Sequence, residues 1–203
     1  MATGVRSRAK ALRALAEEAE GCRACPLWQR GTQTVFGAGP VDARLVLVGE
    51  QPGNEEDLAG EPFVGPAGRL LDDALEDAHI ERSAVYTTNA VKHFKWEARG
   101  KRRIHQKPNR SEVVACHRWL EGELALLPED SVVVALGATA GQALFGPSFR
   151  VGQARGQALE LDGHPAVATI HPSAALRLRG KPEFPEVYEG LVDDLRRAAE
   201  LQP

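Results

Sequence analysis

Four stretches of the chain are continuously apolar and rich in β-branched residues, which predicts strands that are buried on both faces. They span residues 43–49, 83–91, 131–137 and 165–171. Between and around them, apolar positions recur three or four residues apart, which is the spacing of an amphipathic helix. This second pattern predicts helices over residues 5–20, 65–78, 110–127, 137–146 and 184–200. Strands that alternate with helices favour a mostly parallel sheet with helices on both sides.

The expected architecture is therefore an α/β fold, a three-layer αβα sandwich around a four-stranded, mostly parallel sheet. The chain has 203 residues and shows no internal repeat or low-complexity linker, so we expect a single domain over residues 1–203. Two local signals support the helix positions. Pro66 suits a first helical turn, and Ser111 is expected to be the N-cap of the helix that follows it.

Unusual polar motifs follow three of the predicted strands. They are "GEQPG" (49–53), "NAVKH" (89–93) and "HPSA" (171–174). In an open parallel sheet, ligands bind beyond the carboxyl ends of the strands, so the three motifs predict a binding site at one edge of the sheet. The segment 92–109 starts from the same edge and has no helical or strand periodicity. Long loops in compact domains are usually functional.

Positive charge is concentrated in this part of the chain. The formal net charge is −3, which excludes a globally basic coat for nucleic acid. Residues 92–118 nevertheless hold nine Lys and Arg against two acidic residues, and the rest of the chain has 16 basic and 26 acidic residues. This local concentration predicts a surface for a polyanion.

The chain carries no apolar run of membrane-spanning length, and its first 22 residues lack the apolar centre of a signal peptide. Three cysteines cannot form a complete set of disulfides. We therefore expect a cytoplasmic protein with reduced thiols and no membrane contact.

The three cysteines also suggest a metal site. Cys22 and Cys25 have the Cys-x-x-Cys spacing, and Cys116 lies on the predicted helix 110–127. Three soft ligands need a fourth, and His93 is the best placed histidine because it closes the second strand. The alternative is that the cysteines are buried and structural. The spacing does not distinguish zinc from an iron–sulfur cluster.

Taken in order, the Cys-x-x-Cys pair, "GEQPG", "NAVKH" and "HPSA" resemble the uracil-DNA glycosylase superfamily, close to its iron–sulfur branch, families 4 and 5. The resemblance runs from about residue 20 to about residue 180. The basic insertion "KRRIHQKP" (101–108), within a loop over about 94–109, and the Gln of "GEQPG" are similar to the UdgX-type members, which crosslink to DNA. The resemblance implies the αβα fold and a 4Fe–4S cluster. Because His93 stands where relatives have their third cysteine, it implies Cys22, Cys25, His93 and Cys116 as ligands.

The resemblance also assigns roles to individual residues. Gly49, Gln51 and Phe63 are similar to residues that surround the flipped uracil, with Phe63 stacking on the base. Asn89 matches the residue that reads the N3–H and O4 edge, and an amide can do so because it presents both a donor and an acceptor. His171 matches the group near O2, and Glu50 faces the sugar. Ser173 and Arg177 lie on the segment that resembles the DNA-wedging loop.

His105 matches the residue that replaces water as the nucleophile in the UdgX-type branch. A nucleophilic histidine must be neutral, and the neighbouring cations are expected to lower its pKa and to contact phosphates. These cations are Lys101, Arg102, Arg103 and Lys107.

The resulting hypothesis is a monomer, acting on nucleoid DNA in a bacterial cytoplasm, that excises uracil, preferably from single strands, and becomes linked through His105 to C1′. One alternative is a conventional turnover glycosylase that uses water. Another is a metal-stabilised module that binds single-stranded DNA without catalysis. Taken alone, a basic run is most often a solvated surface, but its place beside the polar motifs favours function.

Overall fold

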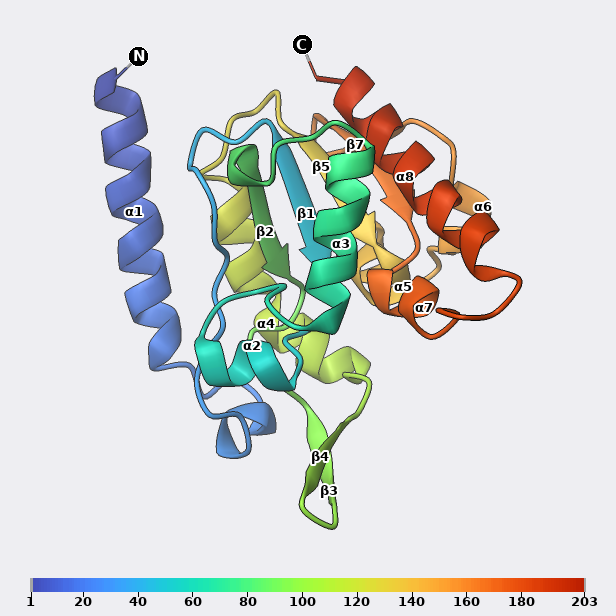
Figure 1. Cartoon of the computed structure of the whole chain (residues 1–203). Coiled ribbons are helices and arrows are strands. Elements are labelled where there is room, and N and C mark those ends of the chain that lie inside the picture. The colour runs from blue at the N-terminus through green and yellow to red at the C-terminus, as the bar shows by residue number, and fades with distance from the viewer. Residues whose placement is uncertain (1, 203) are drawn as a thin grey trace.

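The computed structural model describes residues 2–202 and shows a three-layer αβα arrangement around a five-stranded sheet (Figure 1). The strand order is β2-β1-β5-β7-β6, and only β6 runs antiparallel to its neighbour. The strands are β1 (Leu45–Gly49), β2 (Val85–Asn89), β5 (Val132–Leu136), β6 (Leu159–Leu161) and β7 (His164–Thr169). The predicted fold class is therefore confirmed, with one strand more than expected.

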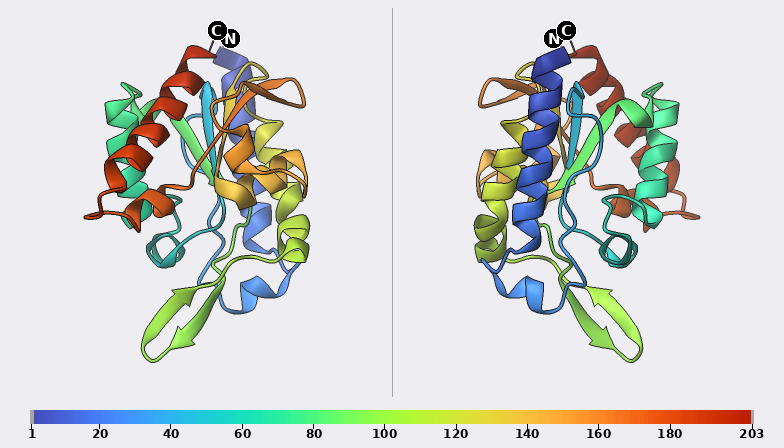
Figure 2. Two further views of the ribbon diagram at one scale, coloured as in Figure 1. Left: turned by 90° about the vertical axis from the view of Figure 1, so that its right-hand side faces the viewer. Right: turned by 90° about the vertical axis from the view of Figure 1, so that its left-hand side faces the viewer.

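Helices cover both faces of the sheet, as the two side views show (Figure 2). Alternate side chains of the central strands point into two separate apolar clusters, so each face has its own core. The first face packs on α3 (Pro66–Asp77), α7 (Pro172–Leu176) and α8 (Phe184–Glu200). The second packs on α1 (Ala2–Glu20), α4 (Arg110–Leu124), α5 (Gly137–Phe145) and α6 (Val151–Ala154). Short helices complete the fold: η1 (Pro26–Gln29), α2 (Asn54–Ala59) and η2 (Arg82–Ala84).

The local helix signals were half right. Pro66 occupies the first turn of α3, as predicted. The N-cap of α4 is Asn109 and not Ser111: the Asn109 side chain accepts from the backbone N–H of Glu112, and the Glu112 carboxylate accepts from the backbone N–H of Asn109. This reciprocal capping box satisfies two helix-end donors at once, which a cap at Ser111 would not do.

The extra strand, β6, is three residues long and follows no recognisable apolar pattern, which is why the sequence did not predict it. It reaches β7 through a tight turn in which Asp162 and Gly163 both have positive φ, 48° and 90°. Such a turn is typical of a hairpin between antiparallel strands.

The segment 92–109 is not an irregular loop but carries a β-hairpin that projects from the body (Figure 1). Its strands are β3 (Trp96–Arg99) and β4 (Arg102–His105), with Trp96 opposite His105 at the base. Gly100 supplies the positive φ of 62° that the two-residue turn requires. Its side chains are largely exposed, so no apolar periodicity marks its strands in the sequence. The hairpin starts from the edge where the parallel strands end.

A fully buried ion pair joins β2 to α4 beneath this edge. Lys92 and Glu123 are 1% and 0% exposed, and the Lys92 Nζ donates to the Glu123 carboxylate, to Thr88 Oγ1 at 2.6 Å and to the Asn89 carbonyl oxygen at 2.9 Å. Glu123 also accepts from Tyr86, Thr88 and a backbone N–H. The Lys92 ammonium group thus has three acceptors, and the Glu123 carboxylate has four donor groups, so both buried charges have hydrogen-bond partners.

No helix within residues 2–202 combines the length and the apolar character needed to cross a bilayer.

Replacing Lys92 by Met should destabilise the fold by about 3–5 kcal/mol, because Glu123 would keep its charge without a buried partner. The matched control is Arg44→Met, since Arg44 pairs with Asp130 where both side chains are 51% exposed. That loss should be at most about 1 kcal/mol. Equilibrium urea unfolding measures both, and equal losses would contradict the structural importance of the buried pair.

Candidate active site

Three predicted uracil-binding residues meet at the ends of β1 and β2. Gly49 and Asn89 are register partners in these parallel strands. A methyl group on Gly49 would lie 2.3 Å from Asn89 Oδ1 and 2.6 Å from Phe63 Cζ, closer than any real contact. Glycine is therefore required at position 49. The amide of Asn89 and the ring of Phe63 therefore both lie against Gly49; their contact with uracil stays a prediction.

Phe63 is held in an unusual backbone conformation, with a φ of 59°. A positive φ is rare for a bulky residue and persists where the surrounding structure enforces it. Here the backbone of Phe63 packs against Gly68 so closely that a methyl group there would lie 1.8 Å from the Phe63 carbonyl oxygen. The buried carboxylate of Glu56 also ties this loop to the "GEQPG" motif, accepting from the backbone N–H groups of Gly53 at 3.0 Å and Gly65 at 2.7 Å.

His171 caps the short helix α7 with its own ring. Its Nδ1 accepts from the backbone N–H of Ser173 at 3.1 Å and lies 2.8 Å from Ser173 Oγ. Burial lowers the pKa of His171 to about 4, with His105 and Arg177 acting in the same direction. The ring is therefore neutral near pH 7. Because Nδ1 is the acceptor, Nε2 carries the proton and is the available donor.

Glu50 and His105 form the second half of the site. The Nε2 of His105 lies 3.4 Å from Glu50 Oε1, and the hydroxyl of Thr139 donates to the other carboxylate oxygen. Thr139 lies in the first turn of α5, directly after β5. Thr139 was not among the predicted site residues, because the strand end that it follows carries no charged or amide side chain. The segment "GATAG" after this strand held the signal.

The pKa of His105 is lowered, as expected, but for a different reason. Burial is the largest cause, Glu50 opposes it, and Arg177 adds to it. The four cations of "KRRIHQKP" are not among the causes of this shift; three of them are exposed, and Arg103 pairs with Asp57. The prediction of a lowered His105 pKa was therefore right in direction, but the cause is burial and not the neighbouring cations.

Gln51 fixes the base of the hairpin. Its side-chain NH2 donates to the carbonyl oxygens of Lys95 at 3.2 Å and Gln106 at 3.0 Å, and its oxygen accepts from the Lys95 N–H at 3.2 Å. Both amide hydrogens are thereby used, so the uracil contact predicted for this side chain has no amide donor left. The geometry gives Gln51 a positioning role, because residues 95 and 106 flank the strand that presents His105.

Arg103 fixes the middle of the hairpin instead of pointing to solvent. Its guanidinium pairs with Asp57 at 2.5 Å and donates to Asn54 Oδ1 at 2.7 Å. Asp57 is 0% exposed and also accepts from Thr32. The phosphate contact predicted for Arg103 does not fit this placement. Lys101, Arg102, Lys107 and Arg177 are exposed, while the hydroxyl of Ser173, another predicted DNA contact, lies against His171.

The three cysteines lie in one apolar cluster with Leu27, Val91 and Trp119. The Lys92 N–H donates to Cys116 Sγ at 3.2 Å, and the Trp119 Nε1–H donates to Cys22 Sγ at 3.3 Å. Burial raises the pKa of Cys116 to about 11; Lys92 opposes this, and the other two thiols add to it.

The fourth predicted ligand, His93, is buried and lies two residues after Val91, a member of this cluster. Its Nε2 lies 3.1 Å from Thr34 Oγ1. Within residues 2–202, no group of three or more His, Cys, Asp or Glu side chains is arranged as it stands to hold a metal ion. The set of four ligands therefore stays a prediction, although three thiols and two N–H donors gathered in an apolar pocket suit a thiolate-bound group.

An α/β domain with a buried amide, a neutral histidine and a carboxylate at the ends of its parallel strands defines a candidate base-recognition site. The model of the uracil DNA glycosylase superfamily matches residues 36–196, and the chain belongs to this superfamily. It is 35% identical to a Type-4 uracil-DNA glycosylase of Thermotoga maritima over 194 residues, 95% of each chain.

Two further relatives are informative. A Type-4 uracil-DNA glycosylase of Archaeoglobus fulgidus is 32% identical over 92% of this chain and 91% of its own. A Type-5 uracil-DNA glycosylase of Thermus thermophilus is 38% identical over 134 residues, 59% of this chain and 56% of its own. The superfamily and the closeness to family 4 are thus confirmed, whereas the UdgX-type assignment stays a prediction.

The protonation state of His171 can be tested by NMR. The histidine ring signals of labelled protein should show one imidazole, absent from a His171→Gln variant, that titrates near pH 4 and carries its proton on Nε2 above that pH. The sign follows from burial, which disfavours the charged ring. A midpoint above pH 6 would mean that the ring is not desolvated as the structure shows.

Proposed function

We propose that this protein excises uracil from DNA and that His105 captures the resulting sugar in a covalent bond. The observation that carries the proposal is the approach of His105 to Glu50, 3.4 Å from Nε2 to Oε1, at the edge where Gly49, Phe63 and Asn89 form the base pocket. In this proposal a nitrogen of His105 takes the place of the water molecule that would otherwise attack the sugar.

The pocket suits uracil because of its hydrogen-bonding groups. The Asn89 amide can accept from N3–H and donate to O4, a pattern that cytosine does not match. Phe63 offers its ring face to the base. The base must be flipped out or taken from a single strand to reach this pocket. The proton on His171 Nε2 points to a role at O2, where negative charge develops as the glycosidic bond breaks.

The proposed reaction balances as follows. The bond between C1′ and uracil N1 breaks, and its electron pair leaves on uracil, stabilised by His171. The unprotonated nitrogen of neutral His105 donates its lone pair to C1′. The alkylated ring loses its remaining N–H proton to the departing uracil anion, so both products are neutral, and the Glu50 carboxylate offsets the positive charge that develops on the sugar. The product is a sugar–imidazole N-glycoside, which lacks an activated leaving group and should persist.

A second candidate is a turnover glycosylase in which Glu50 activates water. Glu50 is 21% exposed, and one of its oxygens is held by Thr139, so it could orient a water molecule at C1′. The relatives of Thermotoga maritima and Archaeoglobus fulgidus, named Type-4 uracil-DNA glycosylases, favour this reading. His105 would then serve only to stabilise charge.

Single-stranded DNA is the proposed preferred substrate. Exposed cations lie in the hairpin segment 92–109 and at the C-cap of α7, namely Lys101, Arg102, Lys107 and Arg177. They can contact phosphates on either side of a flipped nucleotide without reading sequence.

The thiol cluster is proposed to hold a 4Fe–4S group through Cys22, Cys25 and Cys116, with His93 as the fourth ligand. The N–H groups of Lys92 and Trp119 already point to two of these sulfurs, as hydrogen bonds to cluster thiolates do. Such a group would crosslink the segment 22–25 to α4 and the end of β2. The residues present would thereby anchor both sides of the hairpin's base.

Covalent capture is tested by mixing the protein with a uracil-containing single-stranded oligonucleotide and running a denaturing gel. A heat-stable shifted band should form with uracil and not with thymine, and His105→Ser should abolish it. Glu97→Ser, on the exposed strand β3 of the same hairpin, is the matched control and should keep the band.

Three outcomes separate the hypotheses. Abasic sites in excess over protein, without an adduct, would support the turnover glycosylase. Binding that falls steeply with salt and shows no uracil preference would indicate a module without catalysis. A band that survives in His105→Ser would assign the bond to another residue.

The cluster is tested by its colour and composition. Protein purified under conditions that retain bound metal should be brown, with broad visible absorption and with iron and sulfide in equal amounts. The Cys116→Ser variant should lose this colour. Zinc as the sole metal would refute the cluster, and an unchanged spectrum in Cys116→Ser would remove this cysteine from the ligand set.

A further inference from the structure

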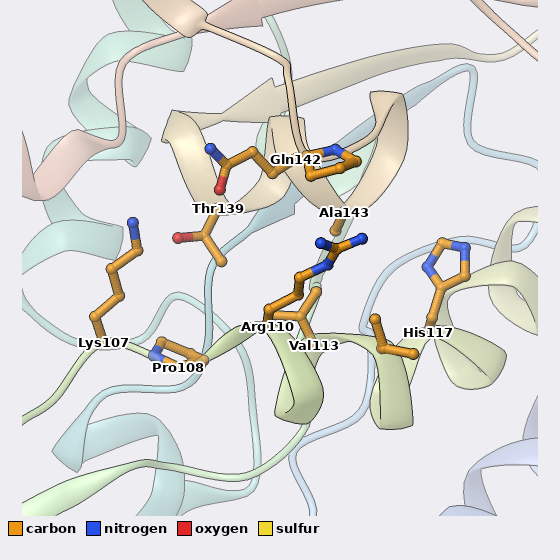
Figure 3. Close-up of a pocket in the computed structure, with 10 residues that line it drawn as sticks. Lys107, Pro108, Arg110, Val113, His117, Thr139, Gln142 and Ala143 are labelled. Carbon is orange, nitrogen blue, oxygen red and sulfur yellow. The ribbon is translucent and has the colours of Figure 1, made fainter.

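A cavity of about 510 Å³ lies between the first turns of α4 and α5, next to the site described above (Figure 3). None of the predicted uracil-binding residues lines it. Its walls come from the end of the hairpin segment and from the two helices. They are Lys107, Pro108, Arg110, Val113, Val114, His117, Thr139, Gln142, Ala143 and Pro147.

The polar groups of this cavity are available for a ligand. Arg110 and Lys107 make no ion pair with any residue within 2–202, and the Gln142 amide has no hydrogen-bond partner among those residues. His117 is paired with Glu121 at 3.2 Å. The remaining wall is apolar, with Pro108, Val113 and Ala143 facing the same space. Two free cations beside an apolar wall suit a ligand that carries a phosphate and a flat ring.

The cavity shares a residue with the candidate active site. Thr139, which lines it, donates its hydroxyl to Glu50, and Lys107 lies two residues after His105. Figure 3 shows Thr139 and Gln142 on α5 facing Lys107 and Arg110 across the space. In a strand whose uracil is being excised, the neighbouring nucleotide is joined directly to the sugar that would meet His105 and Glu50. A cavity that shares Thr139 and Lys107 with this site is therefore in reach of that nucleotide.

We propose that this cavity receives the nucleotide adjacent to the excised uracil in the same strand. Arg110 and Lys107 bind its phosphate, the Gln142 amide contacts the base edge, and the apolar wall covers the base. This inference rests on the proposed function, because it takes the flipped uracil as the fixed point. The volume falls within the range of about 300–1,000 Å³ typical of pockets for compounds of this size.

Val114 offers a sharp test because it lines the cavity and is 64% exposed, so a polar side chain there leaves the fold intact. Val114→Glu adds a negative charge that repels a phosphate and that lies four residues from Arg110, in reach of an ion pair with it. Val114→Gln has nearly the same size and helix propensity without the charge. The two variants therefore differ only in electrostatics.

The experiment uses single-stranded oligonucleotides with uracil inside the strand, at its 5′ end or at its 3′ end. Affinities are compared in a His105→Ser background, which cannot form the covalent bond, so that fluorescence anisotropy gives an equilibrium Kd for the wild-type residue and for each variant at position 114. Single-turnover assays with His105 present give the rate of uracil release. Wild type should bind about tenfold more weakly when the nucleotide on one side is missing, since a charge-assisted phosphate contact is lost. Val114→Glu should bind the strand with an internal uracil about tenfold more weakly than wild type, and removing the neighbouring nucleotide should weaken its binding no further. Val114→Gln should bind every strand as wild type does.

Equal affinities of Val114→Glu and Val114→Gln would overturn the inference. It would also be overturned if Val114→Glu weakened the internal and both terminal substrates equally, since this indicates general repulsion. Release of no uracil from any oligonucleotide would defeat the proposed function, and the Kd values would still decide whether the cavity binds the neighbouring nucleotide.

Discussion

The buried ion pair of Lys92 and Glu123 fixes the edge of the sheet where the candidate active site lies. Lys92 binds the carbonyl oxygen of Asn89 through its side chain and Cys116 Sγ through its backbone N–H. Because neither charge can reach water, the pair is stable only in the geometry that satisfies all its hydrogen bonds. The end of β2, which carries Asn89, is thereby fixed relative to α4 and the thiol cluster. An apolar pair of equal volume would fill the space without specifying this orientation.

The hairpin depends on the body in a similar way. A two-stranded hairpin is at best marginally stable in water, and this one projects from the domain. Gln51 bonds both chain segments at its base, and Arg103 joins its middle to the buried Asp57. Both partners come from the segment that follows β1, which also carries Glu50. The distance between His105 and Glu50 is therefore set by contacts within one local unit, and hairpin and carboxylate keep their relation if the tip moves.

The sequence predicted the core strands, which the apolar pattern marks, and the polar residues at the ends of those strands. The core strands were recognisable because buried residues are continuous in them, and Asn89, His171 and Glu50 because they follow those strands. It could not predict the hairpin, whose side chains are exposed, or β6, which is three residues long. It also could not tell which cation of a basic run turns inward. Arg103 does so because Asp57 is buried opposite it, and a carboxylate 46 residues away leaves no mark in the local pattern.

The charge state of His105 follows from a competition that DNA would shift in a known direction. Glu50 favours the imidazolium, whereas burial and Arg177 disfavour it, and burial is the largest of the three effects. A bound strand brings phosphates that screen Arg177. This weakens the effect of Arg177 on the ring, which is the smaller of the two effects that keep it neutral. The same strand removes water from a side chain that is 49% exposed in the free protein, which strengthens the larger one. Desolvation by a bound strand therefore keeps the imidazole neutral, which is the charge state that the proposed covalent capture requires.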